Sequence, residues 1–266
     1  MTSSGSYKST SLKDAEREFD RLRSQAQRMY PLEKKILTEC GLKPHHDLLE
    51  IGCGPGFNTP LLCELVQDGS VTSCDNDEAL LSRCRSEIKI SPKRGFQTLL
   101  STDKAIPAPD ESSDFSYLRF VLQHTPARHS ILSEAARILR PGGILCVLDS
   151  DDGTILQHPE DPFVTRLVTQ AQETQVQRGG DRFVGRKVSG MLSELGLESV
   201  AYRVFNFTPT DIPFASLANI LFGFKSDLCG QREELNRWIK ETEPRVACGQ
   251  YFLSAGVILT VGKKKV

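Results

Sequence analysis

A glycine-rich turn directly after a short apolar run constrains the fold more than any other segment of the chain. The run is Asp47 to Ile51, and the turn is Gly52-Cys53-Gly54-Pro55-Gly56. Glycines let backbone N–H groups approach a ligand that a Cβ atom would exclude. The segment therefore predicts a strand, a ligand-binding turn and a helix, which together form the first unit of a parallel α/β sheet.

The alternation of strand and helix continues through the following hundred residues. Four further strands are predicted at Val71 to Cys74, Phe96 to Leu100, Phe115 to Leu118 and Ile144 to Leu148. Amphipathic segments at Glu78 to Ile88 and Ala127 to Leu139 predict helices between them. The fifth strand is a continuous apolar run, which is typical of a strand buried on both faces. This order favours a parallel sheet with helices on both sides.

The two ends of the chain depart from this alternation. At the N-terminal end, residues 12–29 and 32–40 predict two helices separated at Pro31. In the last third, helices are predicted at 161–177 and 186–195, and closing strands at 200–205 and 256–261. Residues 207–249 carry apolar side chains at helical spacing, so we expect a helical insertion between these strands.

Composition excludes several classes of function. The 33 Lys and Arg residues balance 34 Asp and Glu residues, which argues against a nucleic-acid binder held by bulk charge. Unbroken apolar runs reach only about five residues, against roughly 20 for a membrane span. The polar start MTSSGSYKST does not resemble a secretory signal, and the eight cysteines form no CxxC pair. We therefore expect reduced thiols and a cytoplasmic protein.

Residues around the turn distinguish between nucleotide-type ligands. A dinucleotide fingerprint needs a third glycine three positions after the second, and Phe57 stands there instead. Asp75 ends the next strand, where a carboxylate accepts hydrogen bonds from both hydroxyls of a ribose. Glu50, just before the turn, suits an amine-bearing ligand better than a pyrophosphate. An NAD(P)-dependent Rossmann oxidoreductase therefore remains only as an alternative interpretation.

Residues Glu50 to Gly56 resemble motif I of the class I S-adenosylmethionine-dependent methyltransferases. Further segments resemble this family in the expected order, namely Cys74-Asp75-Asn76, Ser101 to Pro109, Asp114 to Thr125 and Arg137 to Gly143. The resemblance covers about Leu48 to Asp152 and is closest to the small-molecule, ubiquinone-biosynthesis-like group (methyltransferase type 11). It implies a Rossmann-like α/β fold with a seven-stranded, mostly parallel sheet, helices on both faces and a helical cap.

The resemblance also implies how the chain is organised. Residues 1–11 are expected to be a disordered lead-in, and residues 12–266 a single methyltransferase domain. Within it, residues 12–43 form an N-terminal helical lid and residues 44–152 the cofactor-binding half. Residues 153–266 supply substrate-side helices, the closing strands and the insertion.

Cofactor-binding roles follow from the same resemblance. The turn Gly52 to Gly54 is expected to hold the methionine part of S-adenosylmethionine, with Glu50 accepting from its amine. Asp75 is expected to bind the ribose diol, and Asn76 to lie along the adenine edge. These roles require the glycine turn, Glu50, Asp75 and Asn76 to lie together at one end of the sheet.

Other cofactor assignments leave alternatives open. The family's usual acid in the adenine loop is replaced by Thr102, with Asp103 one place later, so either residue is a candidate for the adenine contact. Arg119 is expected to meet the methionyl carboxylate, the alternative being an exposed surface arginine. Tyr30 or Gln25 of the first helix hydrogen-bonds the same carboxylate or packs in the core.

Candidate residues on the acceptor side follow the fourth and fifth strands. His124 is the best candidate for a general base, and a helix-capping histidine is the alternative. Three aspartates near the end of the fifth strand, Asp149, Asp151 and Asp152, have three alternative roles: they orient the acceptor, remain solvated or bind a cation. No metal site is predicted, because no further acid or histidine is spaced to complete one. Arg182 fixes an anionic acceptor or pairs with nearby acids.

These expectations combine into one function. The chain is expected to transfer a methyl group from S-adenosylmethionine by in-line displacement, leaving S-adenosylhomocysteine. The partner is a small organic acceptor, with the O, N, S or C atom undetermined, and neither nucleic acid nor membrane takes part. A monomer or homodimer is expected, and a non-catalytic cofactor-binding scaffold is a further alternative.

Overall fold

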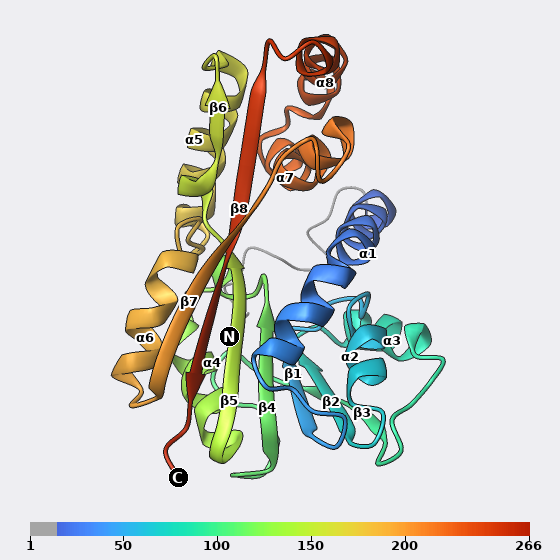
Figure 1. Ribbon diagram of the computed structural model, residues 1–266, viewed down its shortest axis with the longest axis vertical. Helices are drawn as coiled ribbons and strands as arrows, with labels where there is room; N and C mark the ends of the chain where they lie inside the picture. The colour runs from blue at the N-terminus through green and yellow to red at the C-terminus, as the bar shows by residue number, and fades with distance from the viewer. Residues whose placement is uncertain (1–14) are drawn as a thin grey trace.

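One mixed sheet crosses the molecule and is covered by helices on both faces (Figure 1). The computed structural model describes residues 15–266, so the lead-in at 1–11 and the first residues of the predicted lid lie outside the described part. Within it, the strand order is β3-β2-β1-β4-β5-β8-β6, and β7 pairs with β8. This is the Rossmann-like α/β arrangement that the resemblance implies, and its helices cover both faces as the alternation predicts.

The first half of the chain forms the parallel part of the sheet. Its strands are β1 (Asp47–Ile51), β2 (Ser70–Asp75), β3 (Phe96–Leu100), β4 (Ser113–Arg119) and β5 (Leu139–Ser150). Helices α2 (Thr59–Leu65), α3 (Glu78–Glu87) and α4 (Arg128–Ile138) connect them. All five predicted strands are confirmed, because each is a short apolar run bounded by turn residues.

The second half closes the sheet and builds a cap. Its elements are β6 (Leu156–His158), α5 (Pro162–Gln177), α6 (Val188–Glu194), β7 (Glu198–Phe207), α7 (Phe214–Cys229), α8 (Arg232–Ala247) and β8 (Phe252–Lys263). Strand β8 runs antiparallel to β5 and to β7. The insertion is helical as predicted, consisting of α7 and α8.

The expected seven strands become eight in the described part of the chain. Strand β8 starts at Phe252, five residues before its pairing with β5 begins at Val257. The backbone groups of this early stretch need hydrogen-bond partners, and Leu156–His158 supplies them as β6. The extra strand therefore follows from the length of β8.

The prediction of a helix break at Pro31 is wrong. Helix α1 (Ala15–Glu39) continues through this proline. An interior proline costs about 3 kcal/mol in an isolated helix. Here Met29, Ile36 and Leu37 on either side are buried in one cluster against the sheet, and this packing keeps the helix continuous.

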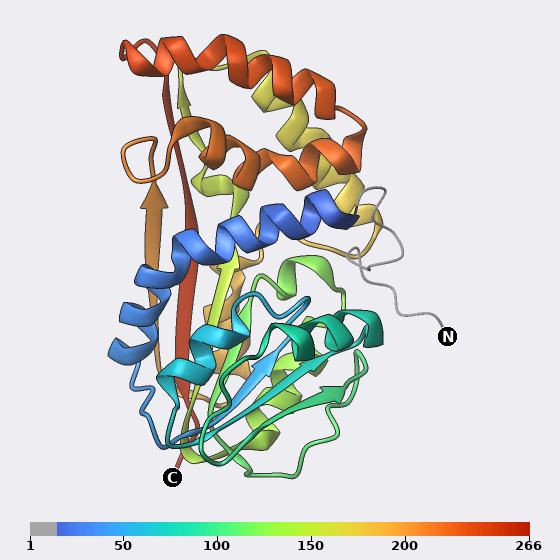
Figure 2. The same ribbon diagram turned by 90° about the vertical axis from the view of Figure 1, so that its right-hand side faces the viewer.

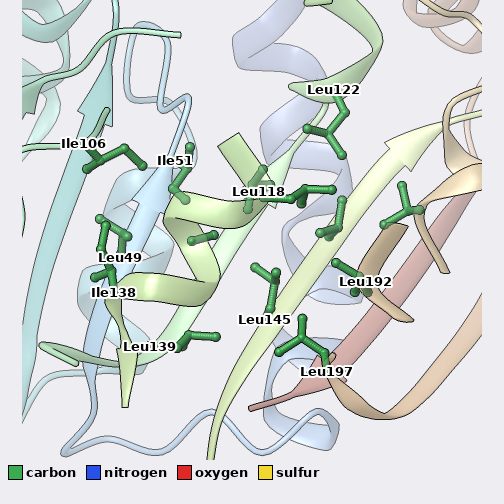
Figure 3. Close-up of a cluster of buried hydrophobic side chains, with 14 of the residues drawn as sticks. Leu49, Ile51, Ile106, Leu118, Leu122, Ile138, Leu139, Leu145, Leu192 and Leu197 are labelled. Carbon is green, nitrogen blue, oxygen red and sulfur yellow. The ribbon is translucent and has the colours of Figure 1, made fainter. Parts of the chain in front are cut away.

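Three apolar clusters hold the layers together. Figure 3 shows part of the first, where Ile138 of α4 and Leu192 of α6 lie near Leu118 and Leu145 on one face of the sheet. Helices α1 and α2 pack on the opposite face. The third cluster surrounds Trp238 and joins α5, α7 and α8 as the cap. Figure 2 shows α1 running between α7 and the part of the sheet that carries β1 to β4.

None of the helices described between residues 15 and 266 is both long and apolar enough to cross a membrane.

Candidate functional site

A cavity of about 270 Å³ lies at the carboxyl ends of the parallel strands, between the sheet, α1 and α7. In open α/β sheets this edge is the usual place for a ligand. Of the predicted site residues, those lining it are Glu50, Gly52, Cys53, Gly54, Asp75, Asn76, Thr102, Asp103, Arg119, His124, Asp151, Asp152 and Arg182. Tyr30 and Asp149 are not part of its lining.

The glycines of the turn serve different purposes. Gly52 and Gly54 have φ values of 72° and 54°, which favour glycine over residues with a side chain. A Cβ atom on Gly54 would meet nothing within 4 Å, so the backbone there faces open space. A Cβ atom on Gly56 would lie 2.6 Å from Cys84 Cα. The third glycine therefore permits close packing on α3.

Glu50 is a buried carboxylate at the base of the turn. Its Oε2 accepts hydrogen bonds from Ser73 Oγ at 2.6 Å and from Thr59 Oγ1 at 2.7 Å. Burial raises the pKa of this carboxyl. Because both bonds use Oε2, Oε1 is the acceptor that the described residues leave available to a ligand.

Asp75 joins the end of β2 to the glycine turn. Its Oδ2 accepts from Gly54 N at 2.8 Å, and its Oδ1 accepts from Asp77 N at 3.1 Å. Burial raises the pKa of Asp75 to about 6. The carboxylate therefore fixes the turn while it also lines the cavity.

The adenine loop places its two candidate residues differently. Thr102 Oγ1 accepts from Ala105 N at 3.1 Å and so holds its own loop. Asp103 Oδ1 accepts from Asn76 Nδ2 at 3.1 Å. Asp103, more than Thr102, therefore shares the edge of the cavity with Asn76.

Arg119 is tied to the first helix. Its Nε donates to Glu33 Oε1 at 2.6 Å, and Tyr117 Oη donates to Glu33 Oε2 at 3.0 Å. The Arg119 side chain is only 12% exposed, so it is not a surface arginine. Sequence reasoning missed Glu33, although its spacing from Met29 and Leu37 puts it on the apolar stripe of α1.

The two candidates on α1 separate. Tyr30 donates its hydroxyl to Glu64 on α2, outside the cavity. Gln25 lines the cavity. Of the pair, only Gln25 lies where a cofactor carboxylate could meet it.

His124 closes the short turn Leu122–His124 (η2) after β4 and lines the cavity. Its ring meets Phe224 edge to face at 5.3 Å, and Gln175 Nε2 lies 3.1 Å from Nδ1. Burial and the charges of Arg182, Arg21 and Lys225 lower the pKa of His124 to about 3. The imidazole is therefore neutral at physiological pH and a weak base.

The aspartates at the end of β5 and directly after it are buried rather than solvated. Asp149 accepts from Leu122 N and Ser150 N, each at 2.8 Å, and burial raises its pKa to about 7. Asp151 pairs with Arg186, whose Nε lies 2.7 Å from Oδ2. Asp149 thus positions the turn that carries His124.

Asp152 is held by two cations at once. Arg182 donates Nε to Oδ2 at 3.0 Å and Nη2 to Oδ1 at 2.9 Å, while Lys225 Nζ lies 3.1 Å from Oδ1. Arg182 thus pairs with a nearby acid, the second alternative predicted for it. Lys225 was missed, although it follows Leu221 and Phe222 at helical spacing on a stretch otherwise uncharged from Phe214.

All eight cysteines are free thiols. Among residues 15–266, no three His, Cys, Asp or Glu side chains lie together as a metal site would require.

Comparison with known proteins finds a family similarity in the part of the fold that holds the turn. Residues 49–147, from β1 to β5, match the family model described as a methyltransferase domain. Over these residues the chain is similar to methyltransferase domains. S-adenosylmethionine is the cofactor of such domains, and Glu50 and Asp75, the residues predicted to meet its amine and its ribose, line one cavity.

Relatives of this methyltransferase domain are distant. An uncharacterized 37.1 kDa protein of transposon Tn4556 from Streptomyces fradiae is 27% identical over 184 residues. The alignment covers 68% of this chain and 49% of that protein, so this chain spans about half its length. A demethylmenaquinone methyltransferase of Bacillus cereus is 24% identical over 194 residues, covering 68% of this chain and 82% of the relative.

The fold is shared with solved methyltransferases. A SAM-dependent methyltransferase of Thermotoga maritima superposes with a TM-score of 0.55 at 19% identity. The superposition covers 94% of this chain and 95% of that one. The match therefore includes the cap as well as the methyltransferase domain's parallel half.

Proposed function

We propose that the protein transfers a methyl group from S-adenosylmethionine to a small organic acceptor. The observation that supports this most is the convergence of the glycine turn, Glu50 and Asp75 on a cavity whose other wall is the cap. One wall suits a nucleoside with an amine-bearing chain. In this proposal the acceptor lies against the other wall, which is built from α7, η2 and the segment after β5.

Each cofactor-side residue has a task in this proposal. Glu50 Oε1 accepts from the cofactor amine, and the Asp75 carboxylate accepts from the ribose hydroxyls. Asn76 and Asp103 border the adenine, while Gln25 and Arg119 meet the methionyl carboxylate. The bound cofactor supplies an activated methyl group, so the protein needs mainly to align the acceptor and exclude water.

His124 orients the acceptor in this proposal. The Nδ1 atom of this neutral imidazole accepts from Gln175 Nε2, so the ring carries its proton on Nε2 and donates a hydrogen bond to an oxygen or nitrogen atom of the acceptor. This hydrogen bond fixes the orientation of the acceptor relative to the methyl group. An acceptor that must lose its proton would transfer it to water, because this ring holds a proton poorly.

Calorimetry with S-adenosylhomocysteine tests the cofactor part directly. We expect micromolar binding by the full chain and at least a hundredfold loss in Asp75→Ala. Asp75→Asn keeps an acceptor for Gly54 N, so it separates ribose binding from support of the turn. Asp68→Ala removes an exposed carboxylate just before β2 and should bind normally. Equal binding by Asp75→Ala and Asp68→Ala would contradict the proposal.

Two alternatives have their own tests. Titration with NADH, followed by nucleotide fluorescence, should show no binding if Phe57 excludes the pyrophosphate. A non-catalytic scaffold would bind S-adenosylmethionine yet release no S-adenosylhomocysteine with any acceptor in a broad screen. Turnover of one acceptor decides against that scaffold.

We also propose a reducing, cytoplasmic setting and a monomer or homodimer that acts without nucleic acid or membrane. The eight free thiols and the balance of 33 basic and 34 acidic residues support this. Size-exclusion chromatography with light scattering gives the oligomeric state.

A further inference from the structure

Three charged side chains meet beneath the cap, on the acceptor side of the cavity. Asp152 follows β5, Arg182 precedes α6, and Lys225 lies on α7. Their side chains are 3%, 8% and 3% exposed, respectively. All three line the cavity, so the cluster joins the sheet, the α5–α6 connection and the cap at one point.

The charges in this cluster do not balance. Asp152 is the one carboxylate within 4.0 Å of Arg182 or Lys225 among residues 15–266. Arg21, the next cation along the wall, is already bonded to Glu18 through Nε and Nη2, both at 2.7 Å. Asp149 forms no ion pair with Arg182 in the described part, and its raised pKa of about 7 weakens its charge at neutral pH. Two cations therefore share one carboxylate at ion-pair distance, and one positive charge lacks a carboxylate of its own.

A buried uncompensated cation is costly unless a ligand supplies the missing charge. Lys225 shows this strain, since burial and the neighbouring Arg182 lower its pKa to about 8. Two of its three N–H donors are used, by Leu221 O at 2.9 Å and by Asp152. The third has no acceptor among the described residues and belongs to a side chain that lines the cavity.

The walls around this cluster are apolar. Ile155, Phe207, Ile212, Leu217 and Leu221 line the cavity and belong to, or pack against, the apolar cluster around Trp238. Such walls favour the hydrocarbon part of a ligand and, by excluding water, strengthen the ion pair that one end of it forms.

We infer that the methyl acceptor is a small organic acid, whose carboxylate pairs with Lys225 in the field of Arg182 and whose apolar body lies against α7. This inference rests on the proposed function and names its substrate class. Lys225 is then a specificity-determining residue, since a neutral analogue leaves its charge unpaired. A ligand held in this way would also fasten the cap to the sheet.

Binding of paired probes tests the substrate class. Phenylacetate and phenylacetamide share size and shape and differ in charge, and phenyl phosphate replaces the carboxylate by a phosphate. With S-adenosylhomocysteine present, we expect phenylacetate to bind at millimolar concentration and at least tenfold more tightly than the amide. Lys225→Met should lose at least tenfold of that affinity, whereas Lys240→Met, an exposed lysine on α8, should lose none.

Equal affinity for acid and amide, retention of acid binding in Lys225→Met, or no binding of phenylacetate overturns the inference. Tighter binding of phenyl phosphate than of phenylacetate also overturns it, because the site would then be a phosphate site. S-adenosylhomocysteine affinity is measured in parallel. If the wild type does not bind S-adenosylhomocysteine, the proposed function fails. Probe binding measured in the absence of S-adenosylhomocysteine still tests the anion site.

The unfolding midpoint gives a second readout that needs no ligand. If Lys225 carries an uncompensated charge, Lys225→Met leaves the Arg182–Asp152 pair intact and the melting temperature equal or higher. If Lys225 is instead a structural partner of Asp152, its loss lowers the melting temperature by several degrees, which overturns the inference. Asp152→Asn should lower it strongly in either case.

Discussion

At the scale of single residues, Asp149 gives the clearest dependence on pH. Its folded pKa of about 7 lies above the ordinary value of 3.8, so the native state binds this proton more tightly than the unfolded chain. Its contribution to stability is therefore complete below pH 4 and is lost as the pH rises toward 7. Between pH 5 and pH 8 the loss amounts to about 2 to 3 kcal/mol.

Urea unfolding of the wild type and Asp149→Asn at several pH values measures this contribution. The difference between their unfolding free energies should fall by that amount over the range, because the asparagine does not titrate. Parallel curves for the two proteins would contradict the assignment to Asp149.

The close approach of the glycine turn to α3 predicts a local packing defect. Gly56→Ala places a methyl group 2.6 Å from Cys84 Cα at a residue with φ of 80°. We expect a loss of about 2 to 4 kcal/mol of unfolding free energy. Gly196→Ala has a similar φ of 76° and open space, so it should cost only about 1 kcal/mol. Comparing the denaturant midpoints of the two variants separates the cost of backbone strain, which both share, from the cost of the steric clash with Cys84, which only Gly56→Ala has.

Single residues also show where sequence reasoning stops. The turn, Asp75 and Asn76 were found because their neighbours in sequence define their place at a strand end. Glu33 and Lys225 were missed because their roles depend on Arg119 and Asp152, which are distant in the chain. A charge on an apolar stripe was visible, but its partner was not.

At the scale of secondary structure, α1 depends on one buried contact. Glu33→Gln removes the charge that faces Arg119 and leaves that guanidinium without a counter-ion. We expect a loss of about 3 kcal/mol in unfolding free energy. Glu39→Gln, near the end of the same helix, breaks only exposed pairs and should cost less than about 1 kcal/mol. Similar losses in both would show that the Glu33 contact adds nothing special.

Asp161, the N-cap residue of helix α5, also binds Trp238 of helix α8. Asp161 Oδ1 accepts from Phe163 N at 2.9 Å, and Oδ2 accepts from Trp238 Nε1 at 3.0 Å. Asp161→Ala loses both bonds and should destabilise by about 2 to 3 kcal/mol. Asp161→Asn keeps the helix cap and should lose about half as much. Thermal unfolding of the two variants separates the contribution of the N-cap hydrogen bond to Phe163 N from that of the hydrogen bond to Trp238 Nε1. Equal losses of stability in the two variants would contradict these separate contributions.

Elements were predictable where local rules decide them. The five parallel strands and the helices between them follow from apolar runs, caps and turns. The continuity of α1 through Pro31 could not be predicted, because packing against the sheet outweighs the local cost of proline. Strand β6 was missed for a related reason, since its partner is the distant start of β8.

At the scale of the whole molecule, the cofactor should join the two halves. Helix α1 and the turn after β4 line the cavity, whereas α8 lies outside its lining. With S-adenosylhomocysteine at about a hundred times its dissociation constant, amide exchange that requires opening of the cavity should slow up to about a hundredfold. Hydrogen–deuterium exchange followed by mass spectrometry should show slower exchange in α1 and η2 and unchanged local exchange in α8. Uniform slowing across α8 and α1 would contradict a local closure.

The junctions of the cap have a consequence for engineering and for divergence. The segment between the end of β7 at Phe207 and the start of β8 at Phe252 enters and leaves on neighbouring antiparallel strands. Its two ends are thus held at a fixed spacing by the sheet, whatever lies between them. We expect residues 208–251 to be exchangeable as one unit. A segment of different length that keeps the contacts with α5 and α1 would give a new acceptor pocket on an unchanged cofactor-binding half.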